Sequence, residues 1–308
     1  MEYIEMGIVE HISQFIPKEN ILEKELMSRH TTFKIGGPCF ILVKIDSISQ
    51  LQKLLPYLVS EKIPYFFLGN GSNLLVSDKG FEGVVITYSS LLAEEIEIGE
   101  NEVVAGGGVL LSKVARKVLD HSLTGFEFAA GIPGTVGGAM VMNAGAYDGE
   151  MKQIVKNVEV VDLEGNLRVL TCEEMEFGYR TSILKREPFI VTKVTFQLEK
   201  GDAKVIKGKM DDLALRRREK QPLEYASAGS TFKRPEGHFA GKLIMDAGLR
   251  GYQVGGARVS DKHCGFVINT GNATAEDVYT LMKDVIKEVQ DKFQVTLEPE
   301  VIRLGEFN

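Results

Sequence analysis

The segment Gly69-Asn70-Gly71-Ser72-Asn73 carries residue types able to bind a phosphate-bearing ligand, and it directly follows the apolar run Tyr65 to Leu68. Glycines let the backbone come close to a ligand, and successive N–H groups with the Ser72 and Asn73 side chains are suited to cradling a diphosphate. A tight β-turn explains the same residues equally well. The segment is not a P-loop, because no Gly-Lys-Ser/Thr follows it.

A second glycine-rich segment reads Gly131-Ile132-Pro133-Gly134-Thr135-Val136-Gly137-Gly138 and is continued by Asn143-Ala144-Gly145. Each glycine would destabilise an ordinary helix or strand by about 1 kcal/mol. Close approach of the backbone to a ligand therefore explains this segment better than plain secondary structure does. The spacing is not the Gly-x-Gly-x-x-Gly dinucleotide fingerprint and no good first strand precedes it, so a Rossmann fold is disfavoured.

A third segment, from Ser227 to Pro235, brings hydroxyls, a glycine and two cations together. Ser230, Lys233 and Arg234 suit an anion or a polarised carbonyl, although a solvated turn of this composition is at least as common. Ser230 is not the nucleophile of a Gly-x-Ser-x-Gly elbow, since Phe232 stands where that motif needs glycine.

Two single residues outside these segments are further candidates. Arg180 could clamp a carboxylate, although a surface arginine is the default interpretation. Glu300 lies in a strand-like run, where a solvated edge carboxylate is equally plausible. The five histidines show no metal-ligand spacing, so no metal site is expected.

The apolar spacing predicts mixed α and β structure. Pro56 is expected to interrupt the first of four long helices, and Thr274 with Asp277 suggests a capping box at the start of the last. A polar break over 199–202 marks a domain boundary. Helices are expected over 48–58, 111–119, 203–220 and 275–293, and strands over 65–68, 84–87, 102–105, 158–163, 167–170, 189–198 and 295–304.

Composition excludes several classes of protein. Among 308 residues, 43 are acidic and 36 basic, giving a formal charge of −7, which is unlike a general nucleic-acid or membrane-surface binder. Cys39, Cys172 and Cys264 fit neither a disulfide framework nor a zinc pattern, so we expect reduced thiols in the cytoplasm. The first residues do not resemble a signal peptide, and no run is long enough to span a membrane.

Taken in order from about Thr31 to Glu306, six motifs resemble those of the UDP-N-acetylenolpyruvoylglucosamine reductase family, in its second subtype without an extra tyrosine-bearing loop. The resemblance implies NADPH-dependent, FAD-mediated reduction of UDP-N-acetylenolpyruvoylglucosamine to UDP-N-acetylmuramate in peptidoglycan precursor synthesis. The matching motifs are Thr32-Phe33-Lys34-Ile35-Gly36-Gly37, Gly69 to Asn73, Gly131 to Gly138 with Asn143 to Tyr147, Tyr179-Arg180, Gly229 to Pro235, and Glu298-Pro299-Glu300-Val301.

The resemblance also implies an α+β architecture. It would combine an FAD-binding fold of p-cresol methylhydroxylase type, made of two α/β subdomains, with a C-terminal α/β substrate-binding domain. The implied limits are 1–89 and 90–202 for the two subdomains and 203–299 for the substrate domain, with 300–308 returning to the second subdomain.

Roles for individual residues follow from the same resemblance. Hydride would pass from the flavin to C3 of the substrate and a proton from Ser230 to C2, while Arg180 and Glu300 stabilise the enol-like intermediate. Lys220 and Arg234 are weaker candidates for the UDP diphosphate. Noncovalent FAD would be held by Gly69, Asn70, Gly71, Ser72, Asn73, Gly131, Ile132, Gly134, Thr135, Gly137, Gly138, Asn143, Ala144 and Gly145.

Two other functions are compatible with the sequence. One is a flavin oxidase or dehydrogenase of the same fold, although such enzymes usually attach the flavin through a histidine or cysteine, and the Gly69 to Asn73 turn has neither. The other is a noncatalytic nucleotide-sugar binder, which the presence of Arg180, Ser230 and Glu300 disfavours. For the reductase we expect no nucleic-acid or membrane partner and a monomer or weak oligomer.

Overall fold

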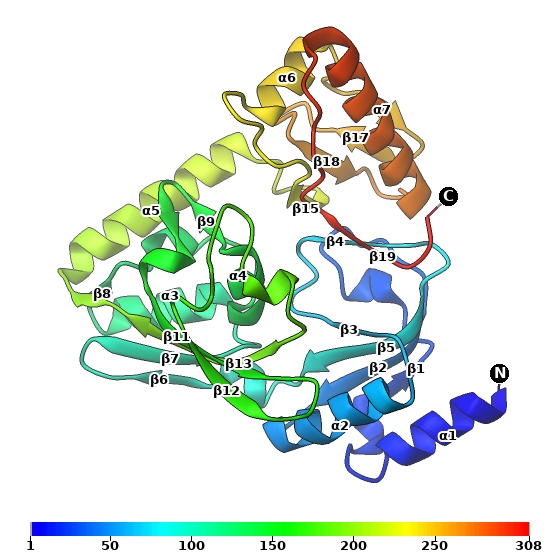
Figure 1. Cartoon of the computed structure of the whole chain (residues 1–308). Helices are drawn as coiled ribbons and strands as arrows, with labels where there is room; N and C mark the ends of the chain where they lie inside the picture. Colours follow the sequence, from blue (N-terminus) through cyan, green and yellow to red (C-terminus); the bar gives the residue numbers. More distant parts are fainter. Residues whose placement is uncertain (1, 308) are drawn as a thin grey trace. The chain divides into compact units, whose positions relative to one another are not determined.

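The computed structural model describes residues 2–307 and confirms the expected α+β class, because helices and strands are both present along the whole described chain (Figure 1). The chain packs into two units. The first contains the residues up to Glu23, Phe40–Gly69 and Gly83–Leu215, and the second contains Lys24–Cys39, Asn70–Glu82 and the chain from Arg216 onward. The long helix α5 (Ala203–Lys220) crosses from one unit into the other.

The first unit begins with helix α1 (Glu2–Ile12) and a four-stranded sheet in the order β1-β2-β5-β3. Helix α2 (Ile48–Ser60) packs on this sheet, with Leu51, Leu54, Leu55 and Leu58 buried against it (Figure 1). The strands are β1 (Ile21–Glu23), β2 (Cys39–Ile45), β3 (Tyr65–Phe67) and β5 (Phe81–Tyr88).

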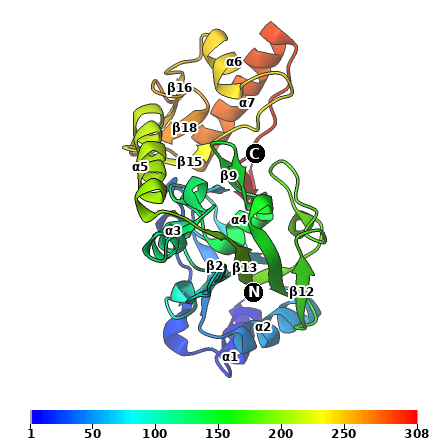
Figure 2. The same ribbon diagram turned by 90° about the vertical axis from the view of Figure 1, so that its left-hand side faces the viewer.

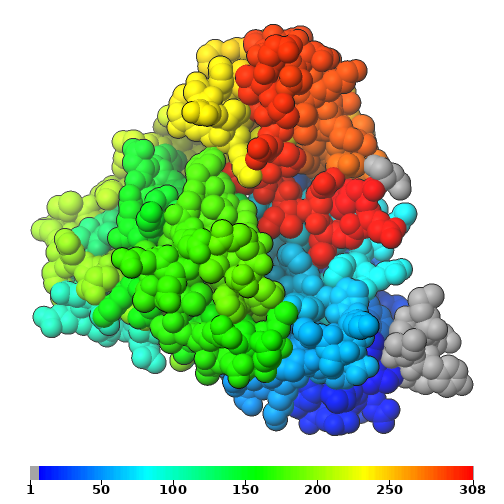
Figure 3. All heavy atoms as spheres, in the orientation of Figure 1, coloured from blue at the N-terminus to red at the C-terminus, as the bar shows by residue number. Residues whose placement is uncertain are grey.

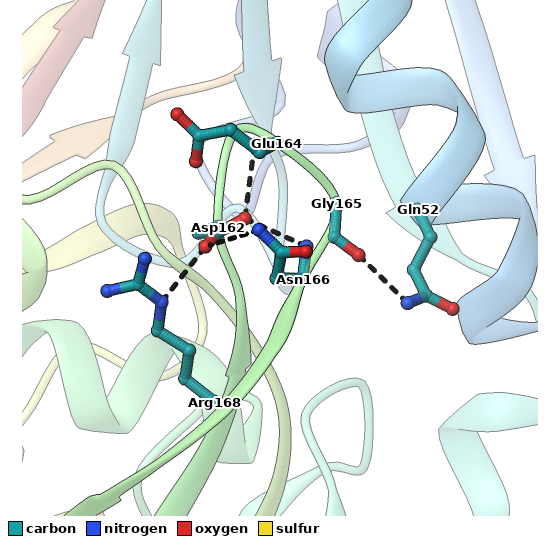
Figure 4. Close-up of polar contacts among 6 residues, drawn as sticks. All are labelled: Gln52, Asp162, Glu164, Gly165, Asn166 and Arg168. Carbon is teal, nitrogen blue, oxygen red and sulfur yellow. Dashed lines mark hydrogen bonds and ion pairs between the residues drawn. The ribbon is translucent and has the colours of Figure 1, made fainter.

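The prediction that Pro56 would interrupt α2 is wrong, because the helix continues to Ser60. Pro56 has no N–H to donate to the carbonyl of Gln52. That carbonyl faces Gly165, where a Cβ would lie only 2.5 Å from the Gln52 oxygen, and the Gln52 side chain donates to the Gly165 carbonyl at 2.8 Å (Figure 4). A neighbouring turn thus packs against the point where proline weakens the helix.

That turn joins two strands of a second, five-stranded antiparallel sheet in the order β12-β11-β13-β7-β6. The Asp162 carboxylate shapes the turn by accepting hydrogen bonds from the backbone of Glu164 and Asn166 and from Arg168 Nε (Figure 4). The strands are β6 (Ile96–Ile98), β7 (Glu102–Gly106), β11 (Val155–Val161), β12 (Leu167–Thr171) and β13 (Ile190–Gln197).

Two helices and several short strands complete the first unit. Helix α3 (Leu111–Asp120) buries Leu111, Val114, Ala115 and Val118 in the core of the second sheet, and α4 (Val136–Met142) buries Val136, Ala139 and Met140 there. The short strands β8 (Leu123–Thr124) and β14 (Glu199–Lys200) pair with each other, as do β9 (Gly145–Ala146) and β10 (Gly149–Glu150).

The second unit contains a four-stranded sheet in the order β15-β18-β17-β16. Helices α6 (Ala240–Asp246) and α7 (Ala275–Phe293) pack against it (Figure 2). Phe33 is fully buried in the same core, so the Thr32 to Gly37 motif packs in this unit. The strands are β15 (Ala226–Ser230), β16 (Gln253–Val254), β17 (Ala257–Val259) and β18 (Phe266–Asn269).

Helix α7 starts and ends where the sequence predicts. Thr274 and Asp277 form a complete capping box, and the Asp78 carboxylate accepts two more hydrogen bonds, from the backbone N–H groups of Ala275 and Glu276, at 2.8 and 3.1 Å. These bonds satisfy N–H groups that the first turn of a helix leaves without partners. They also fix the 70–82 segment to the C-terminal core.

The last strand, β19 (Ile302–Leu304), pairs in parallel with β4 (Leu74–Val76). This differs from the expectation that 300–308 would return to residues 90–202. Leu74 and Leu75 are apolar and buried and offer a strand edge whose backbone pairs with Ile302 to Leu304. On the face drawn in Figure 3 the C-terminal segment lies at the surface. None of the described helices is long and apolar enough to cross a membrane.

Candidate active site

Gly69 and Thr135, from the two glycine-rich segments, lie against each other in the first unit. A Cβ on Gly69 would stand 2.6 Å from Thr135 Oγ1, a distance that real side chains do not tolerate. Thr135 is buried, while Gly69 is exposed. The structure therefore brings two of the predicted cofactor-binding segments together at an open surface, at a position where only glycine fits.

Helix α4 begins at this contact. Thr135 is its N-cap residue, and the Thr135 hydroxyl accepts a hydrogen bond of 3.2 Å from the N–H of Gly138. Gly131, Pro133 and Gly138 are exposed, and Gly134 and Gly137 are partly so. The loop thus presents backbone rather than side chains to its surroundings.

Gly107 and Gly108 form a further close approach that the sequence analysis missed. The N–H of Gly137 donates to the Gly107 carbonyl at 2.8 Å. A Cβ on Gly107 would lie 2.2 Å from the Val191 carbonyl, and one on Gly108 would lie 2.7 Å from the Tyr88 ring. The run Gly106-Gly107-Gly108 was the available signal in the sequence. Its role is to let α4 sit directly against the strands.

The turn Gly69 to Asn73 continues into the second unit at Asn70. Gly71 has a φ of +60°, and a Cβ there would lie 2.0 Å from the His30 carbonyl. Its carbonyl accepts a hydrogen bond from the Thr32 N–H, whereas the N–H groups of Gly71 and Ser72 donate to no other group in the described part of the chain. Gly71 is buried, whereas Ser72 is half-buried and its N–H fits a diphosphate, so the residues present suit the FAD that the sequence predicts.

Asn143 lies at the end of α4 and is buried, with a left-handed φ of 41°. Its side-chain amide donates to Glu150 Oε2 at 3.0 Å and to the Gly178 carbonyl at 3.1 Å, and accepts from the Lys152 N–H at 3.0 Å. The side chain of Asn143 is therefore engaged with protein groups, unlike the exposed loop at the other end of the helix.

Glu127 is a buried carboxylate immediately before the glycine-rich loop, in the short helix η4 (Glu127–Ala129). Thr124 Oγ1 donates to it at 2.5 Å, the Gly125 N–H donates at 3.0 Å, and Lys209 Nζ lies 3.4 Å away. Burial alone would raise the pKa of Glu127, but these hydrogen bonds and the lysine charge hold it below its ordinary value. No motif or spacing in the sequence indicates a role for this residue.

Arg180 lies in a tight turn of the first unit, with a φ of +55°. Gly178 and Thr181 close the turn by exchanging backbone hydrogen bonds of 3.1 and 3.3 Å, and Lys185 Nζ donates to the Arg180 carbonyl at 2.7 Å. The guanidinium carbon lies 5.1 Å from the centre of the Tyr179 ring. The turn therefore holds a cation in a fixed place beside an aromatic side chain.

Ser230 and Glu300 come together in the second unit. Ser230 is exposed at the end of β15, and Glu300 is partly buried. The N–H of Glu300 donates to the carbonyl of Thr231 at 2.8 Å, and the N–H of Lys233 donates to the carbonyl of Glu298 at 2.9 Å. Segments that are about 70 residues apart in sequence are thus joined by backbone hydrogen bonds next to both candidate residues.

Asn73 supports this arrangement. Its side-chain nitrogen donates to the Glu300 carbonyl at 3.0 Å, and its own carbonyl accepts from the Ile302 N–H at 3.0 Å. A residue predicted to bind the cofactor therefore also holds the backbone of Glu300.

The two residues predicted for the UDP diphosphate lie in different parts of the second unit. Lys220 is exposed at the end of α5. The guanidinium carbon of Arg234 lies 4.0 Å from the centre of the Phe239 ring, and its Nε donates to the His238 carbonyl at 3.3 Å. Across residues 2–307, no group of three or more His, Cys, Asp or Glu side chains is arranged to hold a metal ion.

Two protein-family models match parts of the chain. Residues 221–304 match the model of the UDP-N-acetylenolpyruvoylglucosamine reductase C-terminal domain, and residues 41–171 match an FAD binding domain. These matches confirm the expected FAD-binding fold, followed by the C-terminal domain of the reductase family.

Relatives that match over nearly their whole length are named UDP-N-acetylenolpyruvoylglucosamine reductase. The chain is 52% identical over 299 residues to a UDP-N-acetylenolpyruvoylglucosamine reductase of Caldanaerobacter subterraneus subsp. tengcongensis, covering 97% of this chain and 98% of the relative. It is 50% identical over 294 residues to one of Clostridium perfringens, covering 96% of each. The crystal structure of the Thermus caldophilus enzyme, 35% identical, superposes with a TM-score of 0.80 over 92% of this chain and 99% of that one. With identity of this level over nearly all of its length, the chain belongs to the UDP-N-acetylenolpyruvoylglucosamine reductase family.

Proposed function

We propose that this chain reduces UDP-N-acetylenolpyruvoylglucosamine to UDP-N-acetylmuramate, with FAD as its bound cofactor and NADPH as the source of hydride. Family membership over 97% of the chain supports the overall reaction. The observation that supports the chemistry is the backbone hydrogen bond between Glu300 and Thr231, because Thr231 directly follows Ser230, the other acid–base candidate.

Noncovalent FAD would be held by the turn Gly69 to Asn73 and the loop Gly131 to Gly138, with the backbone of Asn143 to Gly145 alongside. The exposed glycines Gly69, Gly131 and Gly138 allow close approach, and the N–H of Ser72 suits the diphosphate. When bound, FAD would accept hydride from NADPH and supply it to C3 of the enolpyruvyl group. Acid precipitation should release the flavin into the supernatant if it is bound noncovalently.

Side chains of the protein would stabilise the negative charge that develops on the substrate and supply the proton to C2. Addition at C3 builds negative charge at C2 and on the substrate carboxylate, and groups that bind this charge more tightly in the transition state lower the barrier. Arg180 would pair with the charge, and Glu300 would hydrogen-bond to it while protonated or sharing a proton. Ser230 would then donate its proton to C2, which requires a strongly basic intermediate or a relay that restores the hydroxyl proton.

The remaining assignments concern the rest of the substrate and the setting of the enzyme. Lys220 and Arg234 would bind the UDP diphosphate through their charges. We assign 1–89 and 90–202 to the two flavin-binding subdomains and 203–299 to substrate binding. We further propose a cytoplasmic enzyme that is a monomer or weak oligomer, which size-exclusion chromatography with light scattering would test.

The decisive experiment follows the flavin spectrum of the purified protein without oxygen. NADPH should bleach the oxidised flavin bands, and the enolpyruvyl sugar nucleotide should restore them. A colourless protein that takes up no added FAD, or a reduced flavin that the substrate fails to reoxidise, would overturn the proposal.

A further inference from the structure

The amide of Asn143 is the centre of a buried hydrogen-bond network in the first unit. Asn143 is 1% exposed, and its side chain contacts the Glu150 carboxylate, the Gly178 carbonyl and the Lys152 N–H. Glu150 lies on the β9–β10 hairpin, in which it pairs with Gly145. A fully engaged buried amide is specific in shape and in the positions of its donors.

One of these contacts reaches the turn that bears Arg180. The Asn143 amide donates to the carbonyl of Gly178, the residue that opens the turn. The other end of the turn is also held from α4, since Ser182 Oγ donates to the Val141 carbonyl at 3.1 Å. Arg180 itself has a φ of +55°, a conformation that side-chain-bearing residues rarely adopt and that the surroundings must impose.

Helix α4 therefore connects two parts of the candidate site. Its N-terminus is the glycine-rich loop at Thr135, and Val141 and Asn143 at its C-terminal end hold the Arg180 turn. The helix has seven residues, so at a rise of about 1.5 Å per residue the two ends are only about 10 Å apart. The helix is short and anchored by the buried side chains of Val136, Ala139 and Met140, so its two ends keep a nearly fixed separation.

We infer that Asn143 is a positioning residue, whose side-chain amide fixes the Arg180 turn and affects the reaction through Arg180 rather than through a side-chain contact with the flavin. This rests on the proposed function, because it takes the role of Arg180 from there. It assigns the Asn143 side chain to the reoxidation of the flavin by substrate, and leaves flavin binding to the backbone groups proposed above.

The first test uses Asn143→Gly and Asn143→Asp. Glycine removes the amide but tolerates the left-handed φ at this helix end, and aspartate keeps the shape but loses both donors. Each should slow reoxidation by substrate by about 100-fold, as expected when a charged group is misplaced by roughly an ångström, while flavin content and reduction by NADPH change little. Gln294→Gly, at the left-handed C-cap of α7, is the matched control and should leave both half-reactions unchanged.

A second test measures amide hydrogen exchange and needs no enzyme turnover. In the flavin-free chain, amide hydrogen exchange in a peptide covering 175–186 should be faster in Asn143→Gly than in wild type, because Gly178 and Thr181 protect each other's amides. The peptide around Gln294 should be unaffected. Unchanged exchange at 175–186 would overturn the inference.

A pair of double variants separates positioning from stability. In Asn143→Asp/Glu150→Gln the two side chains can bond again with donor and acceptor exchanged, but Gly178 still lacks its donor. Thermal stability should recover toward wild type while reoxidation stays slow; recovery of both would overturn the inference. This variant also replaces Asn143→Asp should the single change prevent folding.

The second double variant is Asn143→Gly/Arg180→Ala. If Asn143 acts through Arg180, the double variant should reoxidise no more slowly than Arg180→Ala alone. If the double variant instead reoxidised more slowly by the product of the two single-variant factors, the inference would be overturned and the proposed function would stand. Normal reoxidation by Arg180→Ala alone would instead refute the role of Arg180 in the proposed function, and the inference with it.

Discussion

The backbone N–H of Glu300 donates a 2.8 Å hydrogen bond to the carbonyl oxygen of Thr231. Thr231 directly follows Ser230, is itself buried, and accepts a hydrogen bond from the Val267 N–H through its hydroxyl. The proposed proton donor and the proposed carboxyl partner are thus held near each other by groups other than their own side chains. Each side chain can therefore be changed without removing the hydrogen bonds that bring the pair together.

Ser230→Ala should separate the two half-reactions. We expect reduction of the flavin by NADPH to continue at nearly the wild-type rate, while reoxidation by substrate slows by about 100- to 10,000-fold, the usual contribution of a positioned proton donor. Stopped-flow absorbance of the flavin measures both. Ser227→Ala, on the same strand β15, is the control and should behave as wild type. Equal loss in both half-reactions would contradict a role for Ser230 in protonating C2.

Glu300→Ala should also slow reoxidation, by about tenfold or more, because the developing charge loses a hydrogen-bond partner. Glu300→Gln should lose less, since the amide can still donate a hydrogen bond although it shares no proton. Glu298→Ala is the matched control, because Glu298 lies on the same segment, is exposed and pairs only with Lys233 among the described residues. If Glu298→Ala also slowed reoxidation, the loss would come from the ion pair between Glu298 and Lys233 and not from the Glu300 carboxyl group.

The regular elements could be predicted because their patterns are local. Helix α7 shows a buried face at helical spacing and a capping box, and it begins and ends at the predicted residues. Local patterns also misled, since α2 continues through Pro56. The turn at Gly165, more than 100 residues away, packs against the helix there, and no window of sequence around Pro56 contains that information.

The candidate site could be predicted only as separate segments. Glycine-rich runs indicate close approach but not what is approached, so the contact between Gly69 and Thr135 came from the structure. The roles of Asn73 and Asn143 depend on hydrogen bonds to residues 35 to 227 positions away. The pairing of β19 with β4 is a long-range choice of the same kind.

Gly69→Ala should weaken flavin binding more than it destabilises the chain. The new methyl group would meet Thr135 Oγ1 at 2.6 Å and push it from Gly138, and loss of that N-cap contact costs about 1 kcal/mol. The loop next to the proposed diphosphate site would shift with it. Flavin fluorescence titration of the apoprotein measures the affinity, and chemical denaturation measures stability.

The control for this change is Gly208→Ala. Gly208 lies within α5 and has nothing within 4 Å of its Cβ position, so alanine should stabilise the helix by up to about 1 kcal/mol and leave flavin affinity unchanged. If Gly69→Ala binds FAD as wild type does, the turn is not part of the flavin site.

Glu127→Gln should make stability less dependent on pH in the acid range. Because the pKa of Glu127 in the folded chain lies below its ordinary value of 4.5, the folded state holds its proton less tightly than the unfolded state. The stabilisation from the carboxylate is then fully present above about pH 4.5 and is lost as the pH falls through the lowered pKa. Near neutral pH we expect the glutamine variant to be less stable by about 1–3 kcal/mol, since the donors around the buried Glu127 side chain lose a charged acceptor.

The measurement is the free energy of unfolding from urea titrations between pH 3 and pH 7. The difference between wild type and Glu127→Gln should be largest at neutral pH and shrink below pH 4.5. The control is Glu100→Gln, at an exposed residue in the turn before β7, which should show no such trend.

Because Glu127 is held by Thr124 and Gly125 just before the glycine-rich loop, Glu127→Gln should also bind flavin more weakly at neutral pH. A constant difference at every pH would mean that Glu127 stabilises the loop through its shape and not through its charge.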